Sequence, residues 1–376
     1  MEFLNEIPRE ELIKRARPRT EDHRGFFFRD ITAIIHSYPF RRLKHKTQVF
    51  FAPKNDHICT RIEHVMHVAT ISATICKALS LDVDLAWAIS LGHDFGHTPF
   101  GHVGEKILSA LLEDEGGFNH ELYSLYVVDK LIGYGRGLNL TYAVRDGIIH
   151  HCGEEFEQRI TPEFVVRVLS AEDAVAKLPC TWEGAVMRMA DKVAYLGRDL
   201  EDAVSLHLVS PDEVPGEVRS ILGSSNSEII DTLVHDIVQN AQSEGTIGFS
   251  DDVYAASMLL KKFNYSKIYE SPRLAAYHGY FKRVMDTLFA YLSQILSEFA
   301  FDTDRYIGEG NSLASRFGDY LHKMESYYSE IGESVPRIVA DYIAGMTDDY
   351  AIDSIQEIMI PKKFETAFEE HLYESG

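Results

Sequence analysis

The stretch HDFGHTPFGH, residues 93–102, contains three histidines and one aspartate. An apolar helical stretch, residues 81–91, precedes it and places its first two residues at the end of a rigid element. Two glycines and one proline then interrupt any continuous helix, so we expect the chain to turn and to bring His97 and His102 towards the same pocket. Neutral imidazole and carboxylate groups suit borderline divalent cations. The stretch therefore predicts a site for metal binding and proton transfer.

The length and composition indicate a soluble globular protein. With 376 residues the chain is long enough for a large core in one or two domains. Its 45% hydrophobic and 25% charged residues are ordinary for this class. No apolar run approaches the ~18 residues of a membrane span, the acidic start lacks the apolar region of a signal peptide, and the four cysteines form no CxxC pair. We therefore expect a cytoplasmic protein with reduced thiols and no membrane partner.

The net charge of −21 argues against general binding to nucleic acid or to anionic membranes. Residues 14–48 differ from the rest, because they hold ten Lys and Arg against three Asp and Glu, a local charge of +7 that leaves −28 elsewhere. A solvated or internally neutralised basic face is the ordinary interpretation of such a run. The more specific alternative is that some of these cations line a pocket for an anionic small molecule. This segment is also the one feature that favours binding of single-stranded nucleic acid.

Helical periodicity dominates the pattern, and we predict an all-α fold. Apolar residues recur at three- and four-residue spacing in the segments 61–79, 84–94, 102–112, 120–131, 142–151, 164–176, 183–206, 228–243, 253–262, 277–300, 334–345 and 364–373. Residues 47–60 instead predict a small β-hairpin or an extended ribbon. The segment 211–216, with two prolines and a glycine, is the best domain boundary. We expect a catalytic part at 1–210 and a helical part at 211–376.

Two residues outside the central stretch are the best candidates to complete a metal site, since a d-block metal usually takes three or four protein ligands. His64 lies on a strongly apolar predicted helix, and Asp191 begins the polar stripe of another. Taken separately, a packed histidine and a surface aspartate paired with Lys192 are the more ordinary interpretations.

Taken together, the order of His64, the pair His93-Asp94, and Asp191 resembles the H…HD…D signature of the HD-domain phosphohydrolases. The flanking segments FRRLKHKTQVF, HDFGHTPFGHVGE, GFNHELYS and ADKVAYLGRDLEDA are similar to those of the deoxynucleoside triphosphate triphosphohydrolases, the dGTPase-like branch. This resemblance covers residues 29–202 and implies an HD-domain helical core. Helical periodicity is the sole guide to 211–376, and we expect that part to pack on the core and to contribute to oligomerisation.

The resemblance implies a role for each matching position. The metal ligands would be His64, His93, Asp94 and Asp191, and they leave the divalent ion open between Mn, Mg, Fe, Co, Ni and Zn. The residues that hold water, bind phosphate and protonate the departing 5′ oxygen would be His97, His102, Glu105 and His120, with His102 or His120 as the general acid. The residues that touch substrate would be Arg61 and Lys192 at the phosphates and Gln48, Tyr195 and Asp199 at the deoxyribose.

These positions predict hydrolysis of a 2′-deoxynucleoside 5′-triphosphate to the deoxynucleoside and inorganic tripolyphosphate, with water attacking the α-phosphorus. The resemblance also implies a homo-oligomer, a tetramer or a hexamer, and a nucleotide effector at a subunit interface. Two alternatives stay open: an HD-type phosphohydrolase that acts on another nucleotide, and a nucleotide-sensing or nucleic-acid-binding protein with an idle site. Glu121, where relatives more often have an amide, has no assigned function. For His150 and His151 a buried structural role is the default.

Overall fold

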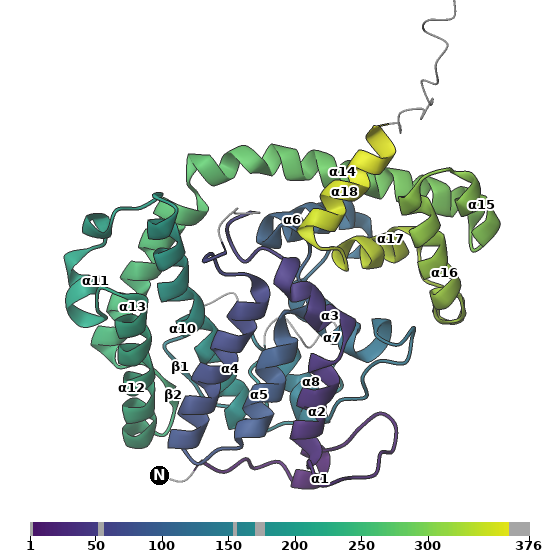
Figure 1. Cartoon of the computed structure of the whole chain (residues 1–376). Helices are drawn as coiled ribbons and strands as arrows, with labels where there is room; N and C mark the ends of the chain where they lie inside the picture. The colour runs from purple at the N-terminus through teal and green to yellow at the C-terminus, as the bar shows by residue number, and fades with distance from the viewer. Residues whose placement is uncertain (1–2, 52–55, 153–155, 170–176, 361–376) are drawn as a thin grey trace, which may run out of the picture.

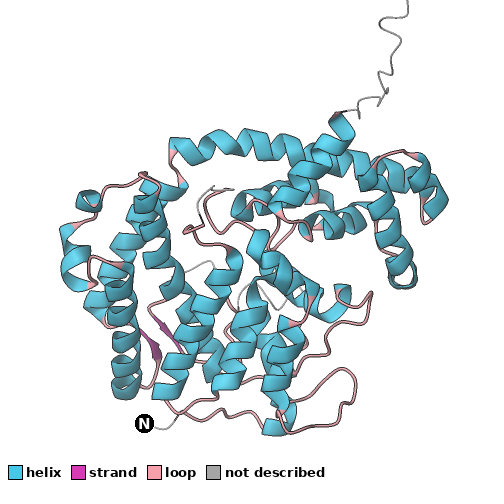
Figure 2. Cartoon of the chain, in the orientation of Figure 1, coloured by secondary structure: helices cyan, strands magenta, loops and turns pink. Residues whose placement is uncertain are grey.

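The computed structural model describes residues 3–51, 56–152, 156–169 and 177–360. Helices dominate these ranges, and a single two-stranded antiparallel sheet is found within them. Figure 2 shows this distribution of helix, strand and loop. The prediction of an all-α fold is confirmed. In the same described ranges, no helix combines the length and the apolar composition that crossing a bilayer requires.

Five helices form the layer that carries the site: α2 (Phe26–Ile35), α4 (Arg61–Ala78), α5 (Val83–Gly92), α8 (Tyr142–Ile149) and α10 (Trp182–Ser205). The central helix is α5, which packs on the other four and is apolar on nearly every side, as an enclosed helix must be. It begins at Asp82, whose carboxylate accepts from two backbone N–H groups of the first turn. The start of α4 is held by Glu63, whose carboxylate accepts from the backbone N–H of Thr60 at 2.7 Å.

Further elements next to this layer carry most of the other predicted site residues. A turn of 3₁₀ helix, η2 (His93–Gly96), follows α5 directly, and α6 (Gly101–Leu111) and α7 (His120–Tyr126) come next. Helix α7 continues as a π-helical turn, η4 (Val127–Leu131). The other short elements of this part are α1 (Arg9–Leu12), α3 (Tyr38–Arg42), η1 (Leu43–His45) and η3 (Glu113–Glu115).

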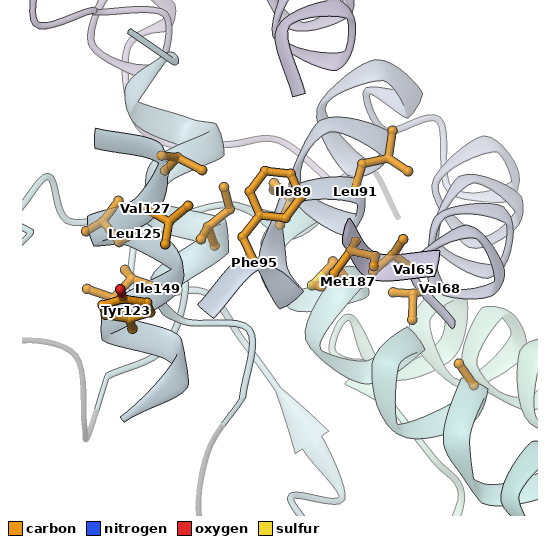
Figure 3. Packing of buried hydrophobic residues seen from close by; sticks show 14 of the residues in the cluster. Val65, Val68, Ile89, Leu91, Phe95, Tyr123, Leu125, Val127, Ile149 and Met187 are labelled. Carbon is orange, nitrogen blue, oxygen red and sulfur yellow. The ribbon is translucent and has the colours of Figure 1, made fainter. Parts of the chain in front are cut away.

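Side chains from α4, α5, η2, α7, α8 and α10 meet in one apolar core (Figure 3). Phe95 lies near the middle of this view, with Tyr123 and Leu125 to one side and Val65 and Met187 to the other. All five side chains are buried. Burial of one phenylalanine side chain contributes ~1.5–3 kcal/mol, so the residue next to the His-Asp pair anchors η2 in the core.

The helices after residue 211 cover two sides of this layer (Figure 1). The 3₁₀ turn η5 (Pro211–Glu213) is followed by α11 (Gly216–Ile221), α12 (Asn226–Glu244), α13 (Asp251–Asn264) and the π-helical turn η6 (Tyr265–Tyr269) on the α10 side. The long helix α14 (Pro272–Phe299) then crosses the top of the view to α15 (Thr303–Gly308), α16 (Ser312–Ile331), α17 (Val335–Ala344) and α18 (Asp348–Met359). The division of the chain into 1–210 and 211–376 stays a prediction.

In its described part, the segment 47–60 does not form the predicted β-hairpin. One antiparallel bridge joins Thr47 to Thr60, and the described residues between them form bends and turns instead of the predicted hairpin strands. The backbone N–H of Thr47 donates to the carboxylate of Asp348, so it is not free for a ladder. The sheet lies elsewhere, where β1 (Arg159–Ile160) pairs with β2 (Ile247–Gly248).

The predicted helix at 164–176 is wrong over its described part, because residues 164–169 are irregular. The backbone N–H of Arg167 donates to the hydroxyl of Tyr142 instead of to a helical carbonyl. Val168 is 82% exposed, so the apolar spacing of this segment does not face a core. The predicted stretches 170–176 and 364–373 lie outside the described residues. Of the helices with ten or more residues in the described ranges, the sequence prediction omits α2, α16 and α18.

Candidate metal centre and active site

Four predicted metal ligands meet at one buried point, although they come from three elements that are distant in sequence. His64 lies on α4, His93 and Asp94 open η2, and Asp191 lies on α10. Nε2 of His64 is 2.9 Å from Oδ1 of Asp191. Nε2 of His93 is 3.9 Å from that same oxygen and 3.8 Å from Oδ1 of Asp94. Ligand atoms of His64, His93 and Asp94 all lie within 4.8 Å of one another.

This donor set fits a divalent cation. Nδ1 of His93 lies 2.7 Å from the backbone carbonyl of Ser90, and a ring N–H donated there leaves the Nε2 lone pair directed at the other ligands. Two neutral imidazoles and two carboxylates would leave a divalent ion formally neutral. Such a set also leaves coordination positions open for water and for a phosphate oxygen.

The carboxylates are held in the ionised form that a ligand needs. Burial acts to raise the pKa of Asp94, but the charge of the Arg61 guanidinium and contacts with His97 outweigh it and hold the pKa well below its usual range. Burial acts on Asp191 in the same direction, and the hydrogen bond with His64 lowers its pKa below the usual range. Both groups are therefore anionic at neutral pH.

Arg61, the first residue of α4, is 1% exposed and forms an ion pair with Asp94 at 2.6 Å. Its Nε and its second terminal nitrogen are buried without a hydrogen-bond partner among the residues that the structure describes. A buried guanidinium N–H without a partner costs free energy. Its planar donor geometry suits phosphate oxygens, so these two nitrogens could donate to an anion bound beside the four predicted metal ligands.

A second group of side chains leads from Asp94 towards solvent. Nε2 of His97 is 2.9 Å from Oδ1 of Asp94, and the ring of His97 stacks on that of His120 with centroids 4.0 Å apart. Oε1 of Glu105 accepts from the backbone N–H of His120 and lies 2.9 Å from its Nδ1. At the outer edge, Nδ1 of His102 is 3.4 Å from Oε2 of Glu105, and the His102 side chain is 70% exposed.

Electrostatics distinguish the two stacked histidines. Burial and the charge of Arg61 hold the pKa of His97 well below its usual range, so its imidazole is neutral. Burial also acts to lower the pKa of His120, but the hydrogen bond and charge of Glu105 outweigh it and raise that pKa. A histidine that a carboxylate orients and keeps protonated is suited to act as a general acid. The sequence analysis named His102 and His120 as the two candidates for the general acid, and this geometry favours His120 over the exposed His102.

One face of α10 carries two of the predicted sugar contacts. Tyr195 and Asp199 follow Asp191 at successive four-residue steps, which places all three on the same side of the helix. The hydroxyl of Tyr269 donates to Oδ2 of Asp199 at 2.5 Å, and burial raises the pKa of Asp199 to about 7. The third predicted contact, Gln48, has a buried Oε1 with no hydrogen-bond partner in the described ranges, so one acceptor is left for a ligand.

Comparisons with known proteins agree with this geometry. The HD domain model matches residues 61–196, which contain all four ligand positions, and the phosphohydrolase-associated domain model matches 247–357. A deoxyguanosinetriphosphate triphosphohydrolase-like protein of Caldanaerobacter subterraneus subsp. tengcongensis is 37% identical over 96% of this chain and 92% of its own length. Proteins of the same description from Clostridium tetani and Desulfatibacillum aliphaticivorans are 36% and 37% identical, over 91% and 90% of this chain and 88% of each relative.

The chain belongs to the deoxyguanosinetriphosphate triphosphohydrolase-like family. The resemblance predicted from the sequence is confirmed, and the protein is an HD-domain phosphohydrolase. HD domains bind divalent metals, and this family member brings together imidazole and carboxylate donors that could hold such an ion.

Lys192, the predicted phosphate contact next to Asp191, pairs with a carboxylate of the protein itself. Its Nζ forms an ion pair with Glu157, and Arg188 contacts the other oxygen of the same carboxylate. Burial lowers the pKa of Lys192, and Glu157 only partly offsets this. A phosphate would compete with Glu157 for the ammonium group, so the predicted phosphate contact of Lys192 stays a prediction.

His151, for which the sequence analysis took a buried structural role as the default, is buried beside the predicted site residues. Its ring centroid is 4.9 Å from that of His93 and 5.4 Å from that of His120. Burial lowers the pKa of His151 to about 4, so its imidazole is neutral at physiological pH. The preceding His150 is also buried, and its Nδ1 lies 3.2 Å from Oδ1 of the buried Asp146. The consecutive histidines after α8 are the signal in the sequence that marks this place.

The C-terminal helices also reach the site. The buried Nζ of Lys46 donates to the backbone carbonyl of His97 and to that of the last residue of α17. Burial lowers the pKa of Lys46 to about 7. At the start of α18, Asp348 accepts from the backbone N–H groups of Thr47 and Phe100 at 3.1 and 2.9 Å. The backbone at His97 and at Phe100 is therefore held by contacts that involve α17 and α18.

A cavity of about 840 Å³ lies between the core layer and helices α16 and α17. Phe95, the neighbour of the His-Asp pair, lines this cavity together with Arg42 and the buried Asp341. None of the four predicted metal ligands is among its lining residues. The cavity is therefore a space distinct from the ligand group, although one core side chain borders it.

Proposed function

We propose that the protein hydrolyses 2′-deoxynucleoside 5′-triphosphates to the deoxynucleoside and inorganic tripolyphosphate, with water attacking the α-phosphorus. The observation that carries this proposal is the set of groups gathered around Asp94. His64 and His93 offer nitrogen atoms within 4.8 Å of a carboxylate oxygen of Asp94. The Arg61 guanidinium pairs with the same carboxylate and has two nitrogens without a partner in the described ranges, and His97 of the stacked pair contacts it as well. The descriptions of the relatives, which name deoxyguanosine triphosphate, support the substrate class.

In this proposal, the phosphates are bound by Arg61 and by the ion that the metal ligands hold. A divalent ion bound by the four ligands supplies a water of lowered pKa and a Lewis acid for a phosphoryl oxygen. The two nitrogens of Arg61 that have no partner among the described residues donate to phosphate oxygens and offset the charge that repels an attacking hydroxide. Lys192 adds a second cation when phosphate replaces Glu157 as its partner. His102, at the exposed edge, contacts the outer phosphates.

The proton-transfer work falls to His120, His97 and Glu105. His120 protonates the departing 5′ oxygen, a role that general acids fill with gains of about 100- to 10,000-fold in rate. Glu105 orients His120 and keeps it protonated until that step. Neutral His97 has a buried Nδ1 without a partner in the described part of the chain, and this atom is suited to hold the attacking water.

Three residues select the sugar. The ring of Tyr195 forms a floor that leaves no room for a 2′-hydroxyl, while Asp199 accepts from the 3′-hydroxyl and Gln48 bonds the deoxyribose. A site that has to hydrogen-bond a substrate hydroxyl strongly rejects analogues without it, because its polar groups are then left unpaired, so the contact of Asp199 selects nucleotides with a 3′-hydroxyl. The preference for deoxynucleotides over ribonucleotides rests on the steric contact of Tyr195 with the 2′ position.

The test is product analysis with each deoxynucleoside triphosphate and Mg²⁺ or Mn²⁺. Deoxynucleoside and tripolyphosphate are expected, and a monophosphate with pyrophosphate would contradict the proposal. Asp94→Ala is expected to abolish turnover, whereas Asp84→Ala on the exposed start of α5 is a matched control that retains it. Nucleoside monophosphates, cyclic nucleotides and alarmones added as competitors test the alternative of an HD-type phosphohydrolase on another nucleotide.

We also propose that 211–376 acts as a separate helical part in the assembly of a tetramer or hexamer, with a nucleotide effector at a subunit interface. Light scattering with and without deoxynucleotides tests both statements. The ion pairs of Arg15 with Asp30 and of Arg24 with Asp22 neutralise part of the basic segment. They weaken the alternative that its main role is to bind single-stranded nucleic acid, which an electrophoretic shift assay tests.

A further inference from the structure

Three side chains of different donor type converge beside the stacked histidines. His120 and Glu121 lie in the first turn of α7, and Cys152 follows the end of α8. One nitrogen, one carboxylate oxygen and the sulfur all lie within 4.8 Å of one another. His120 is buried, while Glu121 and Cys152 are partly exposed. The group is therefore open to a solute from solvent.

This donor set differs in kind from the four-residue ligand group. A sulfur, an imidazole and a carboxylate together match the preference of Zn²⁺, which binds these groups at ~2.0–2.3 Å in a tetrahedron. Thiolate is a soft ligand that the HD ligand group lacks, and it selects thiophilic ions over Mg²⁺ or Mn²⁺. One thiolate and one carboxylate also neutralise a divalent charge.

Cys152 is the one cysteine that a solute can reach. Cys59, Cys76 and Cys180 are buried, and burial raises the pKa of each of their thiols. Cys152 is partly exposed. Since the structure describes all four cysteines, a signal from a metal-bound thiolate in the folded protein reports on Cys152.

We propose that His120, Glu121 and Cys152 form a second cation site that takes a thiophilic divalent ion such as Zn²⁺, and that its occupancy inhibits the enzyme. Nδ1 of His120 is engaged by Glu105, so Nε2 is the atom left for the cation. The inhibitory part rests on the proposed function, in which the same imidazole acts as the general acid. A cation on this nitrogen removes the acid, while the ligand group around Asp94 keeps its own ion.

Binding is tested with Co²⁺ as a probe, because thiolate ligation gives a sulfur-to-cobalt charge-transfer absorption that nitrogen and oxygen ligands do not give. The intact wild-type protein is expected to show this band, Cys152→Ser to lack it, and Glu121→Gln to bind Co²⁺ at least about tenfold more weakly. Cys59→Ala is the matched control that keeps the band. A band that survives in Cys152→Ser, or its absence from the Co²⁺-loaded wild type, would overturn the proposal.

Inhibition is tested by Zn²⁺ titration of triphosphate hydrolysis in saturating Mg²⁺ or Mn²⁺. Cys152→Ser is expected to keep its basal rate and to require at least about tenfold more Zn²⁺ for half-inhibition. Equal sensitivity of the two proteins contradicts the inhibitory role. A complete lack of hydrolysis by the wild type counts against the proposed function, whereas the cobalt absorption still decides whether the cation site exists.

Discussion

The hydroxyl of Tyr269 donates a hydrogen bond to Oδ2 of Asp199 at 2.5 Å. This contact joins the π-helical turn η6 to the face of α10 that carries Asp191. It acts to lower the pKa of Asp199 against the larger effect of burial, which nevertheless raises that pKa to about 7. A residue of the second half of the chain thus partly offsets the effect of burial on the charge of a predicted sugar contact.

Tyr269→Phe is expected to raise KM about fivefold at neutral pH while kcat changes little. The substitution removes a hydrogen bond of ~1 kcal/mol and raises the pKa of Asp199 further, so less of the carboxylate is ionised to accept from a sugar hydroxyl. Steady-state kinetics against pH check this, with the exposed Tyr265→Phe as the control. A collapse of kcat at unchanged KM would show that the tyrosine acts on the chemical step.

Glu105→Gln is expected to move the alkaline limb of the kcat profile to lower pH. The carboxylate raises the pKa of His120, and an acid that must be protonated supports turnover below its pKa and loses it above. Without the charge of Glu105 this loss begins at lower pH, and His120→Ala lowers kcat by about 100- to 10,000-fold at all pH values. The measurement is kcat from pH 5 to 10 for the three proteins. An unshifted limb in Glu105→Gln would exclude His120 as the titrating acid.

Asp94→Ala is expected to lose bound metal and activity and to destabilise the fold by ~3–5 kcal/mol, because it leaves the buried Arg61 without its counter-charge. The double variant Asp94→Ala with Arg61→Met removes that uncompensated charge. It is expected to recover most of the stability and none of the activity. Metal analysis, turnover and denaturant unfolding separate the two effects. Retention of stoichiometric metal by the single variant would refute the ligand role.

Gly96→Ala is expected to destabilise the protein by ~1–3 kcal/mol or more, since overpacking forces its surroundings to move. An added Cβ would lie 2.1 Å from the carbonyl oxygen of His120 and 2.4 Å from the backbone nitrogen of Ser124. Gly216→Ala is the matched control, because no atom lies within 4 Å of its added Cβ, and reduced freedom of the unfolded chain makes it neutral or slightly stabilising. Urea unfolding of both proteins checks the difference, and equal stabilities would contradict the close approach of η2 and α7.

Local patterns made part of the site predictable from sequence. His93 and Asp94 are adjacent at the end of an apolar helix, and Asp191, Tyr195 and Asp199 repeat at a helical spacing, so each group is visible within a few residues. The position of His64 against Asp191 depends on packing of α4 on α10, and the family resemblance supplied it.

Other features depend on contacts that no short segment encodes. Nothing near Tyr269 in the sequence marks it as a partner of Asp199, and nothing near Glu157 points to Lys192. The hairpin predicted at 47–60 is absent from the described residues for a similar reason, because the backbone N–H of Thr47 donates to the carboxylate of Asp348, which is distant in sequence. Helix α16 is different. Its buried side chains follow a clear helical stripe of Leu313, Phe317, Leu321, Met324 and Tyr328, so the signal for it was present in the sequence.

The hydrogen bonds of Asp348 with Thr47 and Phe100 have a kinetic consequence. Phe100 precedes it by 248 positions, yet its amide proton keeps this hydrogen bond only while α18 remains docked. Local opening events in a native protein follow such cooperative units and not the linear order of the chain. Fraying of one late helix therefore exposes the loop between the second and third histidines of residues 93–102 to exchange with water while α4, α5 and α10 stay closed.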